Sequence, residues 1–246
     1  MTVQYLENII TSLMEKSKLK RNIESIIWTI VIVFLIRAFV VQGYVIPSGS
    51  MEDTLLPGDF VLAAKFVYGL EIPYTGVKFF QFYKPKRQKI VIFLFPVDKH
   101  RDFVKRCIGL PGDTIQIINK VVYVNGKPLD EPYAEHKDPR VFPPLVEVDT
   151  PFKQKMYQEA WMEGKFINED RVRDNFGPVV VPENHIFVMG DNRDYSFDSR
   201  FWGPVPMKLL KGAPLIIYFS IDPEQPVWKL WKKIRFGRLF KIVLTA

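Results

Sequence analysis

The feature that most constrains this chain is an apolar segment close to its N-terminus. Ile23 to Val41 supplies 19 mostly apolar residues, interrupted by Glu24 near one end and Arg37 near the other. As a helix these residues are about 28 Å long, close to one hydrocarbon thickness, with the long Arg37 side chain reaching the polar interface. The sequence therefore predicts a single transmembrane helix over residues 23–41.

The charges before this segment predict its orientation. Lys16, Lys18, Lys20 and Arg21 precede it, and positive side chains are retained on the cytoplasmic side of a membrane. Residues 1–22 are thus expected in the cytoplasm and the rest of the chain on the outer side.

Two alternatives to a membrane anchor are open. The triplet Ser48-Gly49-Ser50 also fits the small-residue cleavage site of a secretory signal peptide. However, Arg37 and the residues that follow it separate the uncharged apolar core from Ser50. A buried helix of a soluble domain would need a similar helix to pack against, and the sequence has no second segment of this kind.

The net charge of +7 is concentrated at the two ends of the chain. Residues 1–21 carry four basic and two acidic groups, and residues 227–246 carry six basic and none acidic, so the body between them is nearly neutral. A nucleic-acid binder is expected to carry its basic stripe within a folded domain, whereas basic ends suit a membrane surface. In the tail, four aromatic residues interleave with the basic ones, which suits a bilayer interface or, alternatively, a packed terminal helix: Trp228, Trp231, Phe236 and Phe240.

Cys107 is the only cysteine, which excludes an intramolecular disulfide and a cysteine metal cage. We expect neither a metal nor a cofactor.

Beyond Gly58 the sequence changes to short β-branched and aromatic runs bounded by Gly, Pro and Asn, which is typical of strands. Asn119-Lys120 and Asn125-Gly126 are expected hairpin turns, because asparagine and glycine tolerate positive φ. The predicted strands are residues 59–67, 89–95, 101–108, 114–118, 121–124, 185–189 and 215–220.

The strand pattern is lost between Pro128 and Pro182, where one helical stretch around residues 153–162 stands out. We interpret residues 128–182 as an inserted subdomain. The expected organisation is then a β core of residues 42–127 and 183–226, this insertion, and a basic aromatic tail of residues 227–246.

Three segments carry candidate chemistry. In the first, Ile46 to Leu55, Ser48 and Ser50 flank Gly49, so one hydroxyl could attack a carbonyl while the other, or a backbone N–H, stabilises the developing charge. The composition of this segment equally fits a solvated linker.

In the second segment, Asp102 to Asp113, Lys105 lies within an apolar strand that leads into a Gly-Leu-Pro-Gly turn. A desolvated, neutral lysine could act as a general base on a serine. The structural alternative is an edge-strand lysine that discourages aggregation.

The third segment, Gly190 to Gly203, follows an apolar strand and is rich in Asp, Asn and Ser. A calcium loop is excluded, because Arg193 and Arg200 add positive charge and the terminal glutamate is absent. A polar structural turn remains an alternative.

Together the three segments resemble bacterial type I signal peptidases, membrane-anchored serine proteases that cut signal peptides from exported proteins. The matching patterns, in this order, are Pro-Ser-x-Ser-Met, Lys-Arg leading into Gly-Leu-Pro-Gly-Asp, and Gly-Asp-Asn-Arg-Asp-x-Ser-x-Asp-Ser-Arg-x-Trp-Gly. The resemblance covers most of the chain, but not residues 128–182. Asp53 departs from the family's first motif, which often has proline there.

The resemblance implies a Ser/Lys dyad, in which Ser50 forms an acyl-enzyme and Lys105 is the general base. Ser48 and the backbone N–H of Ser50 would form the oxyanion hole. Supporting roles fall to Ser196, which would hydrogen-bond to Lys105, to an Asp198–Arg200 ion pair, and to Asp191, which would hold the third segment near the dyad. Shallow apolar pockets for small residues before the cut are expected from Ile46, Leu55 and Val104.

The resemblance also implies a mainly β fold, with an antiparallel β-sheet peptidase core and a smaller inserted subdomain, preceded by one N-terminal transmembrane helix. The expected partners are signal peptides of exported preproteins and the lipid bilayer, with no nucleic acid. The expected location is the bacterial cytoplasmic membrane, single-pass, with the catalytic domain on the outer face.

Other functions have less support in the sequence. A Ser-His-Asp triad has little support, because only His100, His136 and His185 exist and none lies in a motif. A self-cleaving repressor-type peptidase would need a DNA-binding domain in place of the anchor. An inactive anchored β domain that binds peptides would not require both Ser50 and Lys105.

Overall fold

The computed structural model describes residues 2–71, 78–79, 83–226 and 228–243, in two compact units, residues 1–41 and 42–246. In the first unit, α1 (Thr2–Leu35) continues into a π-helical turn, Ile36–Val40. The segment Lys20–Val40 is long and apolar enough to cross a membrane, and only 6% of its most apolar window is buried. It matches the transmembrane helix predicted over residues 23–41.

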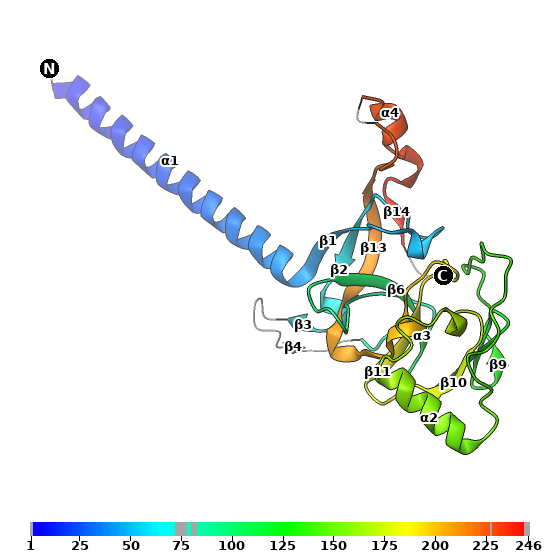
Figure 1. Ribbon diagram of the computed structural model, residues 1–246. Helices are drawn as coiled ribbons and strands as arrows, with labels where there is room; N and C mark the ends of the chain where they lie inside the picture. Colours follow the sequence, from blue (N-terminus) through cyan, green and yellow to red (C-terminus); the bar gives the residue numbers. More distant parts are fainter. Residues whose placement is uncertain (1, 72–77, 80–82, 227, 244–246) are drawn as a thin grey trace. The chain divides into compact units, whose positions relative to one another are not determined.

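The second unit is built around an antiparallel sheet in the order β1-β2-β13-β5-β6-β11-β12, with β14 paired to β13 (Figure 1). The fold is therefore mainly β, as the sequence predicted. The strands of this sheet are β1 (Val41–Val45), β2 (Asp59–Ala64), β5 (Ile90–Leu94), β6 (Asp102–Gly109), β11 (His185–Met189), β12 (Val205–Pro206), β13 (Leu210–Ser220) and β14 (Lys241–Ile242).

A second sheet has the order β10-β7-β8-β9, and β3 pairs with β4. Both predicted hairpin turns of this sheet are confirmed, because Asn119, Lys120, Asn125 and Gly126 all have positive φ. The strands are β7 (Thr114–Ile118), β8 (Val121–Val124), β9 (Lys127–Pro128), β10 (Phe176–Val180), β3 (Leu70–Glu71) and β4 (Lys78–Phe79).

Three predicted strands, residues 114–118, 121–124 and 185–189, have the predicted bounds. The strand predicted over residues 215–220 begins earlier, at Leu210, because a register shift lets Gly212 pair with β5 despite the interrupted apolar pattern. The strand β10 was not predicted, since Gly177 and Pro178 break its pattern while Phe176 and Val179 are buried.

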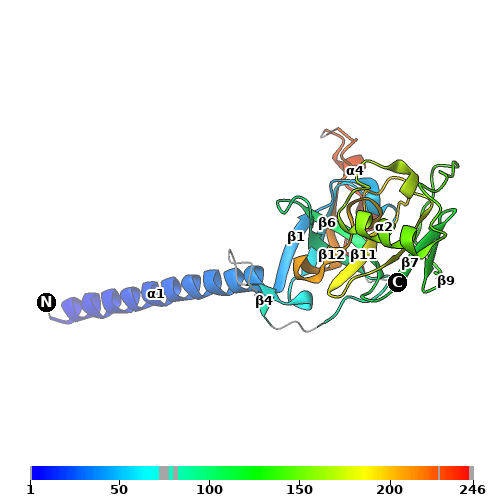
Figure 2. The same ribbon diagram turned by 60° about the horizontal axis from the view of Figure 1, so that its bottom comes forward.

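The helix expected around residues 153–162 is α2 (Pro151–Met162), which packs against β10 (Figure 1, Figure 2). The Thr150 side chain caps its N-terminus by accepting from the Lys153 N–H, and Pro151 stands where no amide donor is needed. Trp161 is fully buried and its Nε1 donates to the Ser199 carbonyl at 2.6 Å.

This contact joins the expected insertion to the third segment. Strand β10, from within residues 128–182, pairs with β7 from outside them. The boundaries of the inserted subdomain stay a prediction.

The remaining helices are short: 3-10 turns at Gly49–Met51, Phe66–Tyr68, Asp170–Val172, Met207–Leu209 and Phe236–Arg238, and the α-helices α3 (Ser199–Trp202) and α4 (Leu230–Lys233).

In the C-terminal tail, the described residues form α4, a 3-10 turn and β14 rather than one packed helix. Several aromatic side chains there are exposed, among them Trp228 and Trp231 at about three-quarters. Arg238 instead turns inward to the buried carboxylate of Asp59.

Asp59 joins three parts of the second unit. Its carboxylate accepts hydrogen bonds from the Leu56 N–H at 2.8 Å, from Ser220 Oγ at 2.7 Å and from Arg238 Nε at 3.0 Å. Arg238 also donates to the Thr54 carbonyl at 3.0 Å. Burial alone would raise the pKa of Asp59, but these bonds outweigh it and hold the pKa below its ordinary value. The tail is thereby attached to the loop that follows Ser50.

We expect Arg238→Ala to lower the free energy of unfolding by about 3 kcal/mol, because it leaves a buried carboxylate without its charged partner. Urea unfolding of the purified protein in detergent micelles, followed by tryptophan fluorescence, measures the loss. Lys165→Ala is the control, since it removes an ion pair to Glu163 in which both side chains are exposed, and its midpoint should not move. An unchanged midpoint for Arg238→Ala would show that the Asp59 contact contributes nothing.

Candidate active site

The first and second segments meet at a hydrogen bond between two side chains. Lys105 Nζ donates to Ser50 Oγ at 2.5 Å, although the residues are 55 positions apart. Lys105 lies in the middle of β6, opposite Val91 of β5, and is 4% exposed. Ser50 lies in a 3-10 turn, and the buried Met51 and Leu55 that follow it fix this turn to a small apolar cluster.

Burial changes the protonation of this lysine. It lowers the pKa of Lys105 to about 8, because the charged amine loses its hydration. The carboxylates of Asp198 and Asp191 oppose the shift, and the charge of Arg200 adds to it. At pH 8 about half of the Lys105 side chains are therefore neutral and able to accept a proton.

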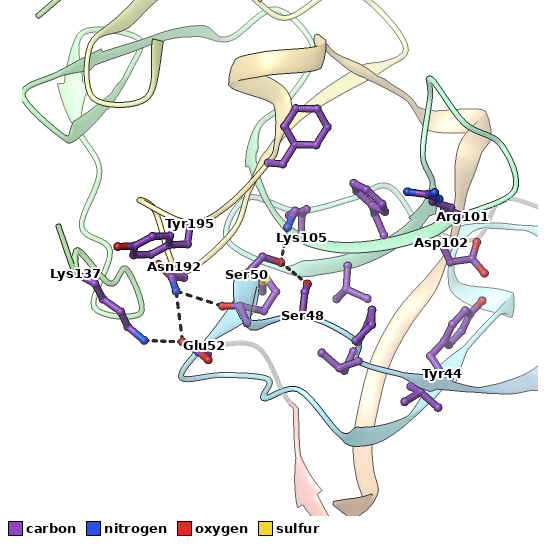
Figure 3. Close-up of a pocket in the computed structure, with 18 residues that line it drawn as sticks. Tyr44, Ser48, Ser50, Glu52, Arg101, Asp102, Lys105, Lys137, Asn192 and Tyr195 are labelled. Carbon is purple, nitrogen blue, oxygen red and sulfur yellow. Dashed lines mark hydrogen bonds and ion pairs between the residues drawn. The ribbon is translucent and has the colours of Figure 1, made fainter. Parts of the chain in front are cut away.

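Ser48 places a second hydroxyl at the same point. It has an extended backbone just before the 3-10 turn, and its Oγ lies 3.5 Å from Ser50 Oγ. The two hydroxyls and Lys105 line one cavity of about 890 Å³ (Figure 3).

Asp191 joins all three segments through one buried carboxylate. It accepts from Arg106 Nε at 2.8 Å and Nη2 at 2.6 Å, and from Thr54 Oγ1 at 2.7 Å. Thr54 belongs to the first segment, Arg106 to the second and Asp191 to the third. Because alternate side chains of a strand point to opposite faces, Arg106 reaches Asp191 while Lys105 faces Ser50.

The chain around Gly190 also holds the turn of Ser50. The Asn192 N–H donates to the Ser50 carbonyl at 3.2 Å, and Asn192 Nδ2 donates to the Gly49 carbonyl at 3.3 Å. A Cβ atom at Gly190 would overlap the Ser50 carbonyl oxygen and Ser196 Oγ. Only glycine therefore permits this close approach.

Asp198 and Arg200 form the expected ion pair. Arg200 Nε and Nη2 each lie 2.8 Å from a different oxygen of Asp198, and both residues are almost completely buried. Burial alone would raise the pKa of Asp198, but the charge of Arg200 outweighs it and holds the pKa below its ordinary value.

Ser196 lies beside these residues, but the described structure contains no hydrogen bond between its hydroxyl and Lys105. Ser196 Oγ instead accepts from the Gly190 N–H at 3.1 Å. This buried backbone donor, just after β11, also lies 3.2 Å from Asp198 Oδ2, so Ser196 and Asp198 satisfy it together.

Two of the three residues predicted to line apolar pockets reach the cavity. Ile46 and Val104 line it, whereas Leu55 is fully buried in the apolar cluster and does not. Among the residues that the structure describes, no group of three or more His, Cys, Asp or Glu side chains could hold a metal ion.

The family model described as "Signal peptidase, peptidase S26" matches residues 19–219. The chain belongs to this family. A signal peptidase I of Buchnera aphidicola (subsp. Schizaphis graminum) is 34% identical, the match covering 89% of this chain and 81% of that protein. Signal peptidase I of Aquifex aeolicus is 33% identical over 84% of this chain and 89% of its own, and that of Pseudomonas aeruginosa is 33% identical over 85% and 72%.

Among solved structures, the crystal structure of a signal peptidase I from Enterococcus faecalis V583 matches with a TM-score of 0.35 and 28% identity. It covers 53% of this chain and 96% of that one.

Sequence reasoning left several residues of this S26 peptidase site without a role. Three of them lie within the three segments: Thr54, Arg106 and Asn192. For Arg106 the sequence holds a signal, because an arginine in an apolar strand indicates a buried ion pair. Lys137 also lines the cavity and pairs with Glu52, 85 residues earlier, and no local pattern connects them.

The lowered pKa of Lys105 can be measured directly. In the protein labelled with ¹³C and ¹⁵N at lysine, one side-chain NMR signal should titrate near pH 8, charged below and neutral above, and Lys105→Met should remove it. The signal removed by Lys165→Met should titrate above the ordinary lysine range, because pairing with Glu163 raises the pKa of Lys165. A Lys105 midpoint above pH 10 would contradict the desolvation argument.

Proposed function

We propose that the protein is a membrane-anchored serine endopeptidase that removes N-terminal signal peptides from exported preproteins, with Ser50 as nucleophile and Lys105 as general base. The observation that carries this proposal is the 2.5 Å hydrogen bond from Lys105 to Ser50 at a buried site that lowers the pKa of the amine to about 8. The substrate class is supported by the relatives, which are named signal peptidase I.

In the proposed reaction, neutral Lys105 takes the Ser50 Oγ proton while Oγ attacks the scissile carbonyl carbon. The Ser48 hydroxyl and the Ser50 backbone N–H stabilise the oxyanion that forms. When the C–N bond breaks, Lys105 returns the proton to the departing amine of the mature chain, leaving the signal peptide as an ester on Ser50. Water, deprotonated by Lys105, then attacks the ester carbonyl carbon, and Lys105 returns the proton to Ser50 Oγ as the ester C–O bond breaks. The signal peptide leaves, and its new carboxyl group loses its proton to solvent.

The supporting residues act in this proposal through position and electrostatics. Asp191 keeps the third segment against the dyad, and the Asp198–Arg200 pair stabilises the buried chain behind Lys105. Ser196 acts through Gly190, whose closeness to the Ser50 carbonyl sets the position of the nucleophile.

The anchor in this proposal is Lys20–Val40, with the basic residues before it on the cytoplasmic side. The catalytic unit then lies on the outer face of the bacterial cytoplasmic membrane, where signal peptides emerge. Exposed tryptophans and lysines of the tail suit contact with the bilayer interface.

Substitution of the dyad tests the proposal. With a peptide that spans a signal-peptide cut, Ser50→Ala and Lys105→Met should each lower kcat about ten-thousandfold or more. Lys105→Arg should be nearly as inactive, because a guanidinium stays protonated. Ser17→Ala and Lys20→Met, which alter a Ser-x-x-Lys match next to the anchor and far from the dyad in sequence, should keep wild-type activity. Retained activity in Ser50→Ala would refute the mechanism.

The apolar wall predicts a preference for small residues. Peptides with alanine one and three residues before the cut should be cleaved at least about a hundredfold faster than those with leucine or phenylalanine, because the branched Ile46 and Val104 limit the space. Val104→Ala should narrow this difference. Val97→Ala, exposed and outside the cavity, is its control. Equal rates for alanine and phenylalanine would rule out these walls.

A further inference from the structure

The cavity has a charged part that the proposed mechanism leaves unused. Lys137 Nζ donates to Glu52 Oε2 at 2.5 Å, and both side chains line the cavity while remaining partly exposed, at 42% and 27%. Figure 3 places Glu52 and Lys137 on one side of Ser50, with Tyr44 and Asp102 on the other. The cavity therefore extends past Ser50 in two directions, and the Glu52–Lys137 pair lies in one of them.

The chain next to Lys137 is held in place by backbone bonds to the third segment. The Glu135 N–H donates to the Asp191 carbonyl at 2.7 Å, and the Arg193 N–H donates to the Glu135 carbonyl at 2.9 Å. On the other side of Lys137, the Asp138 N–H donates to Asp194 Oδ2 at 2.7 Å. The chain on both sides of Lys137 is thus anchored to the third segment, and Lys137 contributes a positive charge to the cavity.

Glu52 is held from the opposite direction. It lies two residues after Ser50, and Asn192 Nδ2 lies within hydrogen-bond distance of both its carboxylate, at 3.4 Å, and the Gly49 carbonyl, at 3.3 Å. The carboxylate is therefore positioned by the same asparagine that holds the turn of the nucleophile.

We propose that Glu52 and Lys137 form a charge pair that contacts the first two residues after the cut and makes cleavage sensitive to their charge. This inference rests on the proposed function. Ile46 and Val104 line the cavity and follow Tyr44 and Asp102, on the other side of Ser50, by two residues each. If the small residues before the cut contact Ile46 and Val104, the departing chain leaves Ser50 toward the pair. Because each charge offsets the other, peptides with acidic or basic residues at these positions are cleaved at similar rates. When one charge is removed, the remaining one favours substrate residues of the opposite charge.

Six peptides test this pair, carrying Asp, Gln or Lys at the first or at the second position after the same cut. The measured quantity is the ratio of kcat/KM for the Asp peptide to that for the Lys peptide. Glu52→Gln should raise this ratio about threefold to fivefold at one or both positions, and Lys137→Gln should lower it by a similar factor. Both shifts should shrink in about 1 M salt, which screens partly exposed charges.

The ratio is independent of any general loss of activity in a variant. Lys153→Gln is the matched control, because Lys153 is also 42% exposed and paired, to Asp149, but lies outside the cavity lining; its ratio should stay that of the wild type. Unmoved ratios in Glu52→Gln and Lys137→Gln, or shifts in the same direction, would overturn the charge pair alone. A wild-type protein that cuts none of the six peptides would overturn the proposed function itself.

Discussion

The site depends on the buried carboxylate of Asp191. A buried carboxylate must be paired and hydrogen-bonded, and Asp191 meets this requirement with Arg106 of β6 and Thr54 of the serine loop. These two partners come from the same strand as Lys105 and the same loop as Ser50. Satisfying one buried charge therefore also brings the serine and the lysine within 2.5 Å.

The charges around Lys105 explain how a lysine among two carboxylates keeps a lowered pKa. Asp191 is paired with Arg106, and Asp198 with Arg200, so each nearby negative charge is already compensated by a guanidinium. The hydrogen-bond partner of Lys105 is the neutral Ser50 hydroxyl, and desolvation outweighs the remaining attraction of the carboxylates. The two ion pairs thus weaken the attraction between the Lys105 amine and the nearby carboxylates.

Residues 128–182 contribute to the site as well as to the fold. Trp161 of α2 bonds to the backbone of Ser199, and Glu135 pairs with the chain at Asn192. Both contacts fall on the third segment, which in turn holds Ser50. Residues 128–182, which match no family motif, are therefore packed against the third segment, which carries the longest motif.

The sequence alone determined the N-terminal apolar helix, the mainly β body, both hairpin turns and the candidacy of Ser50 and Lys105. These depend on local hydrophobic period, turn chemistry and short motifs, which are properties of neighbouring residues. Only the tertiary structure decided that Ser196 bonds to Gly190, that Leu55 belongs to the core, that Arg238 reaches Asp59 and that Lys137 reaches Glu52. Those partners lie up to 179 residues apart, and their meeting depends on how the whole chain packs, which no local spacing encodes.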